Sequence, residues 1–480
     1  MIWSRTAAVL LAVNSLLLCG CPNKPAANNK SNVASFRGQE VELVAPASFQ
    51  LPAVWEVALQ EWMNQSGATV RWTEYDPQSD SLVQKLADPI PVGGRVILFP
   101  LRELSVIDRH LAPLPSGAGI DFNDLFKGLR DRVISRNRSP VAIPIAAPEF
   151  LCYYRADLLR KAGLKPPETW DDYQVLLDSL DKWAPGLTAV EPLAADSRAA
   201  LLFARSLAYV KHPENYSVWF DLESGQPVLE TPGFQAAVES ASHAWKKMPP
   251  SISELTPLQA RHQILEGKAA LAIGAEPTMA AKDIVRAESI EIGVCRLPGS
   301  RRVYNTNSKR WDSIPASGVH GPTLSGFDGW AIGVGSTDSG KSADAALNLL
   351  GSLAGDQFES NWASLPKTPC RESQVTTAAS WHESGLTLEE ASKSVDAAAL
   401  TLRDNQVVAD LPIPKSAQFR QATNEVIARL LKDELDATAA VHQLQVDFTA
   451  IVKEIGADTI RANYRRGLGL PALNSPEITK

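Results

Sequence analysis

The sequence predicts an α/β protein in which helices cover a parallel sheet, and three observations support this fold class. Residues 41–100 follow the order strand, helix, strand, helix, strand, which builds a parallel sheet. The segment GRVILFP at 94–100 is apolar at nearly every position, as a strand buried on both faces is. The segment at 329–355 follows the order strand, turn, helix. A length of 480 residues favours two domains.

The first elements have clear local signals. VELVAPAS at 41–48 is a predicted strand followed by a loop. In the segment 51–67, apolar residues recur at helical spacing, and Gly67 occupies the position of a C-terminal cap. ATVRWTEYD at 68–76 alternates apolar and polar residues, which predicts a second strand, and SDSLVQKLAD at 79–88 is a short predicted helix.

The middle and end of the chain continue the mixed pattern. SPVAIPIAAPEF at 139–150 predicts an extended, proline-marked crossing. A helix predicted at Ala156–Ala162 stops at Gly163, and Thr169 begins the next helix, where Asp172 completes a capping box. Further helices are expected at 234–248, 258–267, 419–435 and 438–455, and further strands at 269–273 and 289–299.

The N-terminus has the pattern of a targeting segment. Arg5 gives it a short positive start, and an apolar stretch follows. The sequence LCGC at 18–21 resembles a bacterial lipobox, which implies that residues 1–20 are a lipoprotein signal peptide and that Cys21 is lipidated. An ordinary cleaved signal with two incidental cysteines is the alternative. Residues 21–40 predict a flexible tether, so we expect an exported, membrane-anchored lipoprotein facing the periplasm or the cell exterior.

Composition and cysteine spacing narrow the function classes. The net charge of −7 lacks the basic footprint of a nucleic-acid binder. Cys152, Cys295 and Cys370 would remain after processing, and they show no metal-ligand spacing, so no metal site is predicted. One disulfide with one buried thiol, and three buried thiols, are both compatible with the sequence, because geometry decides between them.

The motif GSTDSGKS at 335–342 fits the phosphate-binding P-loop pattern. We reject a nucleotide site because an exported chain meets little ATP and because a turn between strand and helix favours these residue types anyway. No G-x-S-x-G elbow and no H-E-x-x-H pair is present, so no catalytic residue and no cofactor is predicted. The two carboxylates of a glycosidase need no local motif, which leaves a secreted carbohydrate-active enzyme as an alternative.

Three segments in order carry a family resemblance. They are YYRADLLRKAGLKPPETWDDY at 153–173, LEGKAALAIGAEP at 265–277, and the segment 325–369, which begins SGFDGWAIGV and ends SLPKTP. Together they resemble the solute-binding proteins of ABC importers, in the carbohydrate branch that includes maltose-binding protein. The resemblance spans roughly residues 40–375.

This resemblance implies a two-lobed fold of the type II periplasmic-binding-protein kind, with a cleft between the lobes. Lobe 1 would comprise residues 41–146 plus 319–370, and lobe 2 would comprise 147–318 plus 371–480. Ligands of open α/β sheets bind beyond the carboxyl ends of the strands. The candidate ligand-binding residues at such places are Phe49, Arg102, Glu149, Glu276, Phe327, Asp328 and Trp330.

A carbohydrate has apolar C–H faces and a rim of hydroxyls, so flat aromatic side chains and planar polar groups suit it. Phe327 and Trp330 are candidate platforms, and Asp328 is a candidate acceptor. Glu149 would meet hydroxyls or serve as a solvated hinge residue, and Arg102 would pair with the carboxylate of an acidic sugar or lie on the surface. The family's aromatic habit alone adds Trp219, Trp245 and Trp362 as cleft candidates.

The resemblance implies a lipid-anchored receptor that captures a carbohydrate, closes about a hinge and delivers its ligand to an ABC permease. The implied partners are the small-molecule ligand, the membrane subunits of the permease, and the membrane through the lipid anchor. We expect a monomer that binds no nucleic acid and is not an enzyme. A binding lipoprotein that feeds a sensor kinase is the main alternative, and the solute would be a sugar, a polyol or a glycerol-phosphate ester.

Overall fold

The computed structural model describes the greater part of the chain. The described residues are 35–49, 53–76, 81–87, 94–116, 119–250, 254–278, 284–315, 318–336, 340–355, 368–375, 385–471 and 473. The predicted signal peptide, Cys21, most of the predicted tether and Trp362 lie outside these residues.

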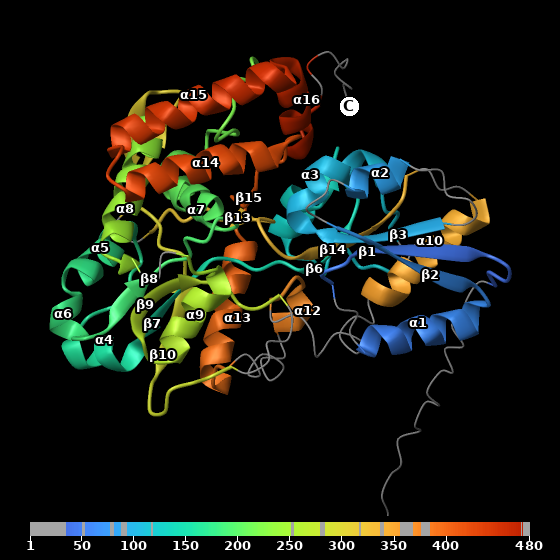
Figure 1. Cartoon of the computed structure of the whole chain (residues 1–480), viewed down its shortest axis with the longest axis horizontal. Coiled ribbons are helices and arrows are strands. Elements are labelled where there is room, and N and C mark those ends of the chain that lie inside the picture. Colours follow the sequence, from blue (N-terminus) through green and yellow to red (C-terminus); the bar gives the residue numbers. More distant parts are fainter. Residues whose placement is uncertain are drawn as a thin grey trace, which may run out of the picture.

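A five-stranded sheet forms the centre of the first body of the molecule, which carries β1–β3 in Figure 1. Its strand order is β2 (Thr69–Tyr75), β1 (Glu40–Pro46), β3 (Gly94–Pro100), β14 (Trp330–Val334) and β6 (Ile143–Ala146). The first three strands are parallel, whereas β14 runs antiparallel to both β3 and β6. The sheet is therefore mixed, and the predicted parallel order holds for its first three strands.

Helices cover both faces of this sheet. The helices α1 (Ala53–Ser66) and α10 (Gly340–Ala354) pack on one face, where the core includes Trp55, Val96 and Leu349. The helices α2 (Ser81–Ala87) and α3 (Leu104–Ile107) pack on the other face, with the 3-10 turns η1 (Leu101–Glu103) and η2 (Asp108–His110) beside them.

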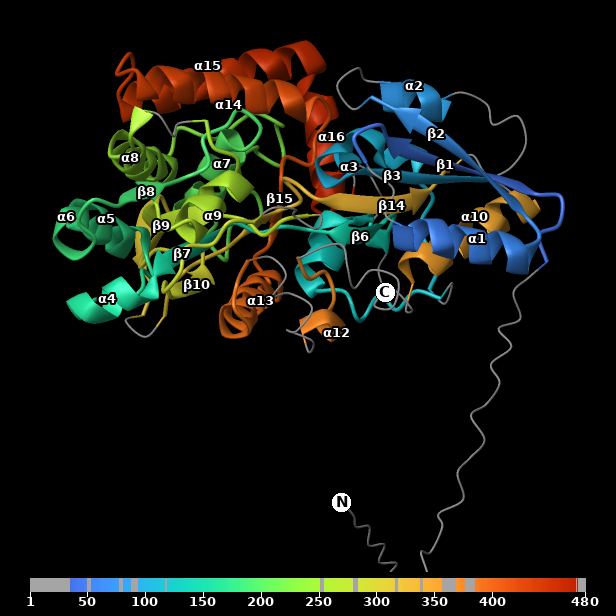
Figure 2. The same ribbon diagram turned by 60° about the horizontal axis from the view of Figure 1, so that its bottom comes forward.

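A four-stranded sheet forms the centre of the second body. Its order is β10 (Ile292–Arg296), β7 (Leu151–Arg155), β9 (Ala269–Gly274) and β8 (Thr188–Val190). The helices around it are α4 (Ala156–Ala162), α5 (Trp170–Asp178), α6 (Leu180–Trp183), α7 (Arg198–Val210), α8 (Pro232–Lys246), α9 (Pro257–Leu265) and α13 (Leu388–Leu402). Figure 2 shows the two bodies side by side.

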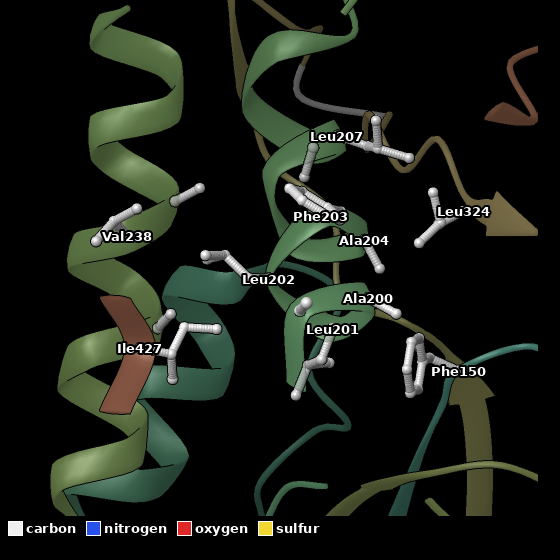
Figure 3. Close-up of a cluster of buried hydrophobic side chains, with 14 of the residues drawn as sticks. Phe150, Ala200, Leu201, Leu202, Phe203, Ala204, Leu207, Val238, Leu324 and Ile427 are labelled. Carbon is white, nitrogen blue, oxygen red and sulfur yellow. The ribbon is translucent and has the colours of Figure 1, made fainter. Parts of the chain in front are cut away.

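Helix α7 is the central element of the second core. Every residue from Ala199 to Val210 is buried, because other helices and the sheet surround it on all sides. Figure 3 shows Leu202 directed towards Val238 and Ile427, while Ala200 and Ala204 face Phe150 and Leu324. Its first residue, Arg198, lies at the end that meets the gap between the two bodies described below.

The last helices join the two bodies. The helices α14 (Ser416–Leu431) and α15 (Ala437–Ile455) lie over α7 and α8, and α16 (Ala457–Gly467) reaches the first body beside α3. The remaining elements are η3 (Leu129–Val133), β4 (Ser135–Arg136), β5 (Ser139–Pro140), β11 (Arg302–Asn305), β12 (Arg310–Ser313), β13 (Leu324–Ser325), α12 (Glu372–Val375) and β15 (Val408–Ala409). Within the described residues, no helix has both the length and the apolar character needed to cross a membrane.

The chain passes between the two bodies at several points. Residues 147–150 lead from β6 in the first sheet to β7 in the second, where the sequence predicts a proline-marked crossing. The segment 319–329 leads back to β14 and includes β13, which pairs with β15. Residues 368–371 lie beside the first crossing, because Thr368 Oγ1 accepts a hydrogen bond from the backbone N–H of Ala147 at 3.1 Å. Three chain segments thus lie together between the bodies.

Candidate functional site

A cavity of about 870 Å³ lies between the two bodies. Its wall on the side of the first sheet begins directly after two parallel strands, since Asp76 follows β2 and Arg102 follows β3. This is the edge at which ligands of open α/β sheets bind. The whole described lining is Asp76, Leu82, Val83, Gln84, Arg102, Glu103, Val106, Ile107, Ala195, Asp196, Arg198, Ala200, Phe327, Lys415, Ser416, Ala417, Arg420, Gln421, Asn424 and Glu425.

The wall on the side of the second body is built from the beginnings of α7 and α14. Arg198 is the first residue of α7, and Ser416 is the first residue of α14. Neither helix has a side-chain hydrogen bond from its N-cap residue. The positive ends of two helix dipoles therefore meet the cavity, together with the Arg420 side chain one turn into α14.

Two predicted site residues reach this cavity. Arg102 and Phe327 both line it. The Phe327 ring stacks on Phe150, with the ring centroids 4.2 Å apart and the planes nearly parallel. This stacking holds the ring in place beside the cavity.

Phe49, Trp330 and Asp328 lie elsewhere. Phe49 is buried against Trp330 at a centroid distance of 5.2 Å and against Trp55 at 5.7 Å, within the core of the first sheet. The Asp328 carboxylate is exposed and accepts a hydrogen bond from the backbone N–H of Gly329 at 2.7 Å. None of these three lines the cavity, so they form no aromatic platform there.

The two predicted glutamates line a second and much smaller cavity of about 10 Å³. Glu149 accepts hydrogen bonds from Ser325 Oγ at 2.7 Å and from Thr323 Oγ1 at 3.3 Å, and burial raises its pKa well above the usual range. Glu276 forms an ion pair with Arg261 at 2.9 Å. Both carboxyl groups are buried and have partners, and a space of this size holds no more than a water molecule.

Glu276 belongs to a buried network that joins three elements. Tyr153 Oη on β7 donates to Glu276 Oε1 at 2.9 Å, and Ser394 Oγ on α13 donates to the same oxygen at 2.9 Å. Arg261 on α9 completes the set, and burial raises the pKa of Tyr153 so that its hydroxyl keeps the proton it donates. The network fixes α9 and α13 to the second sheet.

The tryptophans suggested by the family's aromatic habit lie in the core. Trp219 and Trp245 are buried, and Trp245 Nε1 donates to Glu191 at 2.8 Å. Neither lines the cavity. Trp362 lies outside the described residues.

The rejected P-loop motif also has a structural context. Its Ser342 hydroxyl, in α10, donates to Gln39 Oε1 at 2.7 Å, and residues 337–339 lie outside the described residues. Across the described part of the chain, no group of three or more His, Cys, Asp or Glu side chains is arranged to hold a metal ion.

Sequence reasoning missed most of the second cavity wall. Arg198, Lys415, Arg420 and Asn424 all line the cavity and were not among the predicted residues. A signal was present for Arg198, because it opens the long apolar run AALLFA that a buried helix requires. Arg420 and Asn424 lie on α14 and Lys415 is its N-cap residue, and the position of this helix over α7 depends on contacts distant in sequence.

Comparisons with known proteins bear on the fold. The chain matches maltose-bound MalE3 of T. maritima over 86% of this chain and 99% of that one, with 16% identity and a TM-score of 0.60. It matches the sugar-binding protein MalE of Xanthomonas citri with 16% identity and a TM-score of 0.62, over 87% and 98% of the two chains. The chain has the fold of an ABC solute-binding protein.

A third match is the ABC transporter solute-binding protein of Agrobacterium radiobacter K84 in complex with ribitol. It has 15% identity and a TM-score of 0.61, over 87% of this chain and 100% of that one. No protein-family model and no curated protein matches the sequence. The fold class and the fold resemblance predicted from the sequence are confirmed.

Proposed function

We propose that this protein is the solute-capturing receptor of an ABC importer for carbohydrates or related polyhydroxylated solutes. The observation that carries the proposal is the cavity between the two bodies, with walls from both and polar side chains throughout its lining. Polyhydroxylated ligands need many convergent hydrogen-bonding groups, which carboxylate, guanidinium and amide side chains supply. Solved proteins of this fold are described with maltose and with ribitol.

The proposal includes a division of the chain into two lobes, 41–146 plus 319–370 and 147–318 plus 371–480. It is supported by the two separate sheets and by the three segments between them. A solute that contacts both walls would favour the closed arrangement of the lobes, and a permease would recognise that arrangement. The protein would release its ligand chemically unchanged, as a receptor and not an enzyme does.

The test is a titration of the exported chain with maltose, ribitol, mannitol and tagatose, followed by intrinsic tryptophan fluorescence and calorimetry. We expect saturable binding at micromolar Kd, about −8 kcal/mol, with the ligand recovered intact. Arg102→Gln, in the cavity wall, should weaken binding, whereas Arg71→Gln, which changes an exposed side chain on β2, should not. Chemical conversion of a ligand would contradict the receptor proposal, as would equal effects of the two variants.

Lipid anchoring at Cys21 is a further part of the proposal and has its own test. When the full chain is expressed in a Gram-negative host, Cys21→Ser should move the protein from the membrane fraction to the soluble fraction. Cys19→Ser is the matched control, because this residue would leave with the signal peptide. Retention of the Cys21→Ser variant in the membrane fraction would exclude this anchor.

A further inference from the structure

We propose that the solute carries an acidic group, a carboxylate or a phosphate, and that Arg198 and Arg102 bind this group from opposite walls of the cavity. The inference rests on the proposed receptor function and specifies its ligand. Its basis is the pairing of every charged side chain that lines the cavity.

Arg198 is a charged side chain in the cavity wall. It makes no side-chain hydrogen bond or ion pair with any described residue, and its Nε atom is buried and unsatisfied. Burial lowers the pKa of Arg198, and the charge of Glu254 only partly offsets that effect. Leaving a desolvated guanidinium N–H without an acceptor costs free energy, and an anionic ligand would supply the acceptor.

Arg102 is the corresponding side chain on the opposite wall. It follows β3 and also makes no side-chain hydrogen bond or ion pair with a described residue. The other two cations of the lining are already paired: Arg420 with Asp410 at 2.8 Å, and Lys415 with Glu454 at 2.7 Å. The unpaired positive charge is therefore divided between the two walls, one guanidinium on each.

The carboxylates of the lining do not neutralise these two arginines. Glu103 interacts with the hydroxyl of Tyr75, and Asp76 also has an interaction partner. Glu425 accepts a hydrogen bond from the side-chain amide of Gln421 at 3.0 Å. Asp196 alone among the four has no side-chain partner in the described part of the chain, and it is exposed to water. The carboxylates of the lining can accept hydrogen bonds from the hydroxyls of a sugar acid or sugar phosphate, while the two guanidinium groups bind its negative charge.

Matched pairs of neutral and anionic ligands test the inference. Calorimetry with the exported chain would compare sorbitol with gluconate, galactose with galacturonate, and glucose with glucose 6-phosphate. We expect the anionic member of at least one pair to bind with a Kd about ten- to a hundredfold lower than its neutral partner, because charge-assisted hydrogen bonds are the stronger ones. The gluconate and glucose 6-phosphate arms distinguish a carboxylate from a phosphate.

Arg198→Gln should reduce this preference to less than about threefold, and Arg198→Lys should keep part of it. Arg102→Gln, on the other wall, should also reduce the preference for the anionic ligand, and it provides the test if Arg198→Gln fails to fold. Arg160→Gln, an exposed position on α4, is the control that should leave the preference unchanged. Equal binding of neutral and anionic members, unaffected by Arg198→Gln, would overturn the inference and leave the receptor proposal intact. Absence of binding across these pairs and the neutral panel above would instead remove the receptor proposal itself.

A second inference has an independent basis in the second sheet. Cys152 on β7 and Cys295 on β10 are directly opposite partners in an antiparallel pair, and both pack against the same hydrophobic core. Opposite residues of antiparallel strands have Cα atoms about 4.5 to 5.5 Å apart, which is within the range of disulfide-bonded cysteines. Both carry free thiols in this structure. We infer that they are joined by a disulfide in the exported protein.

The bond would form by exchange with an oxidised dithiol protein of the oxidising compartment. The thiolate of Cys295, which is partly exposed, attacks the oxidant's disulfide, and the Cys152 thiolate then displaces the oxidant's thiol. Two protons leave the cysteines, and two electrons reduce the oxidant's disulfide to a dithiol. The new bond would fix β10, an edge strand of its sheet, to β7.

Alkylation of the denatured, unreduced chain followed by peptide mass spectrometry tests this inference. In protein exported to the periplasm, Cys370 should be alkylated, while the peptides of Cys152 and Cys295 should be found linked. In protein made without its signal peptide in a reducing cytosol, all three should be alkylated. Complete alkylation of Cys152 and Cys295 in the exported protein would overturn the inference.

Discussion

The ion cluster at Asp108 is the most informative single site for testing how the C-terminal helix joins the two bodies. Asp108 accepts a hydrogen bond from Arg136 Nε at 2.8 Å and is also paired with Arg466 on α16. The side chains of Asp108 and Arg136 are 4% and 7% exposed. Burial lowers the pKa of Arg136, and Asp108 supports its charged form. Removing one partner of such a pair leaves an uncompensated buried charge.

Asp108→Asn keeps the shape of the side chain and removes its charge. Because Arg136 stays buried, we expect the free energy of unfolding to fall by about 3 to 5 kcal/mol. Arg466→Gln should cost about 1 kcal/mol, since its side chain is 24% exposed and Asp108 keeps its other partner. Both values follow from urea unfolding monitored by tryptophan fluorescence, as the midpoint shift multiplied by the common slope.

Glu40→Gln is the matched control for this experiment. It breaks the Glu40–Arg71 pair, in which both side chains are more than 40% exposed, and such pairs contribute about 0 to 1 kcal/mol. If Asp108→Asn costs no more than Glu40→Gln, the buried pair contributes no more than the exposed one, and the argument from burial is refuted.

Three further predictions concern single residues. Burial raises the pKa of Glu149 above 4.5, so the folded chain keeps a proton that the unfolded chain releases. The free energy of unfolding should therefore fall by about 1.4 kcal/mol per pH unit from about pH 4.5 up to the pKa of the folded state. Glu149→Gln should lack this slope in thermal melts at a series of pH values, and parallel curves would contradict the assignment. Gly329→Ala should cost about 2 kcal/mol or more in urea unfolding, because φ is +99° and a Cβ would lie 2.1 Å from the Ala146 carbonyl oxygen; a loss below about 0.5 kcal/mol would show that the segment adapts. Thr169→Ala should cost about 1 kcal/mol by loss of the hydroxyl that accepts from Asp172 N, whereas Thr169→Ser should cost less, and equal losses would rule out the cap as the cause.

Elements with a strong local signal were predicted to the residue. Helix α4 has the predicted bounds Ala156–Ala162, and Gly163 at φ 69° ends it in the left-handed conformation. The capping box of Thr169 and Asp172 is present as predicted. Glycine at a helix end and the Thr-x-x-Asp spacing act within one turn, so the sequence alone determines them.

Elements defined by tertiary burial were harder to predict. Helix α7 is buried on all sides, and the core that surrounds it is built by segments distant in sequence. Arginine is usually a surface residue, yet Arg205 of this helix is fully buried and forms an ion pair with Glu191 Oε1 at 2.6 Å. That pairing depends on a residue of another segment, and no local rule identifies it.

The third strand illustrates the same limit for the first sheet. Arg95 departs from the apolar pattern of GRVILFP because it forms a buried ion pair with Glu42 on β1 at 2.8 Å. Gly94 is required for close packing, since an added Cβ would lie 2.1 Å from the Ser342 carbonyl oxygen on α10. The sequence predicts the strand, and these partners explain why it tolerates both residues.

The candidate site divides in the same way. Arg102 follows a strand that the sequence predicts well, so the rule that ligands bind beyond strand ends located it. Arg198 and Arg420 line the opposite wall because α7 and α14 pack together, and this contact joins segments about two hundred residues apart. Arg102 on one wall thus follows from local sequence, whereas Arg198 and Arg420 on the other wall follow from long-range packing.

On the proposed receptor function, the positions of Arg198 and Arg102 would connect binding to closure. A ligand shifts a two-state equilibrium only by the difference between its affinities for the two states. An acidic group bound by Arg198 alone would contact one wall in either state and shift nothing, whereas a group that also reaches Arg102 makes its second contact only when the walls approach. The Asp108–Arg466 pair would act on the same equilibrium from outside the cavity, because it joins the two bodies without ligand. Arg466→Gln should therefore change the proportion of open and closed molecules, which small-angle scattering with and without ligand would measure.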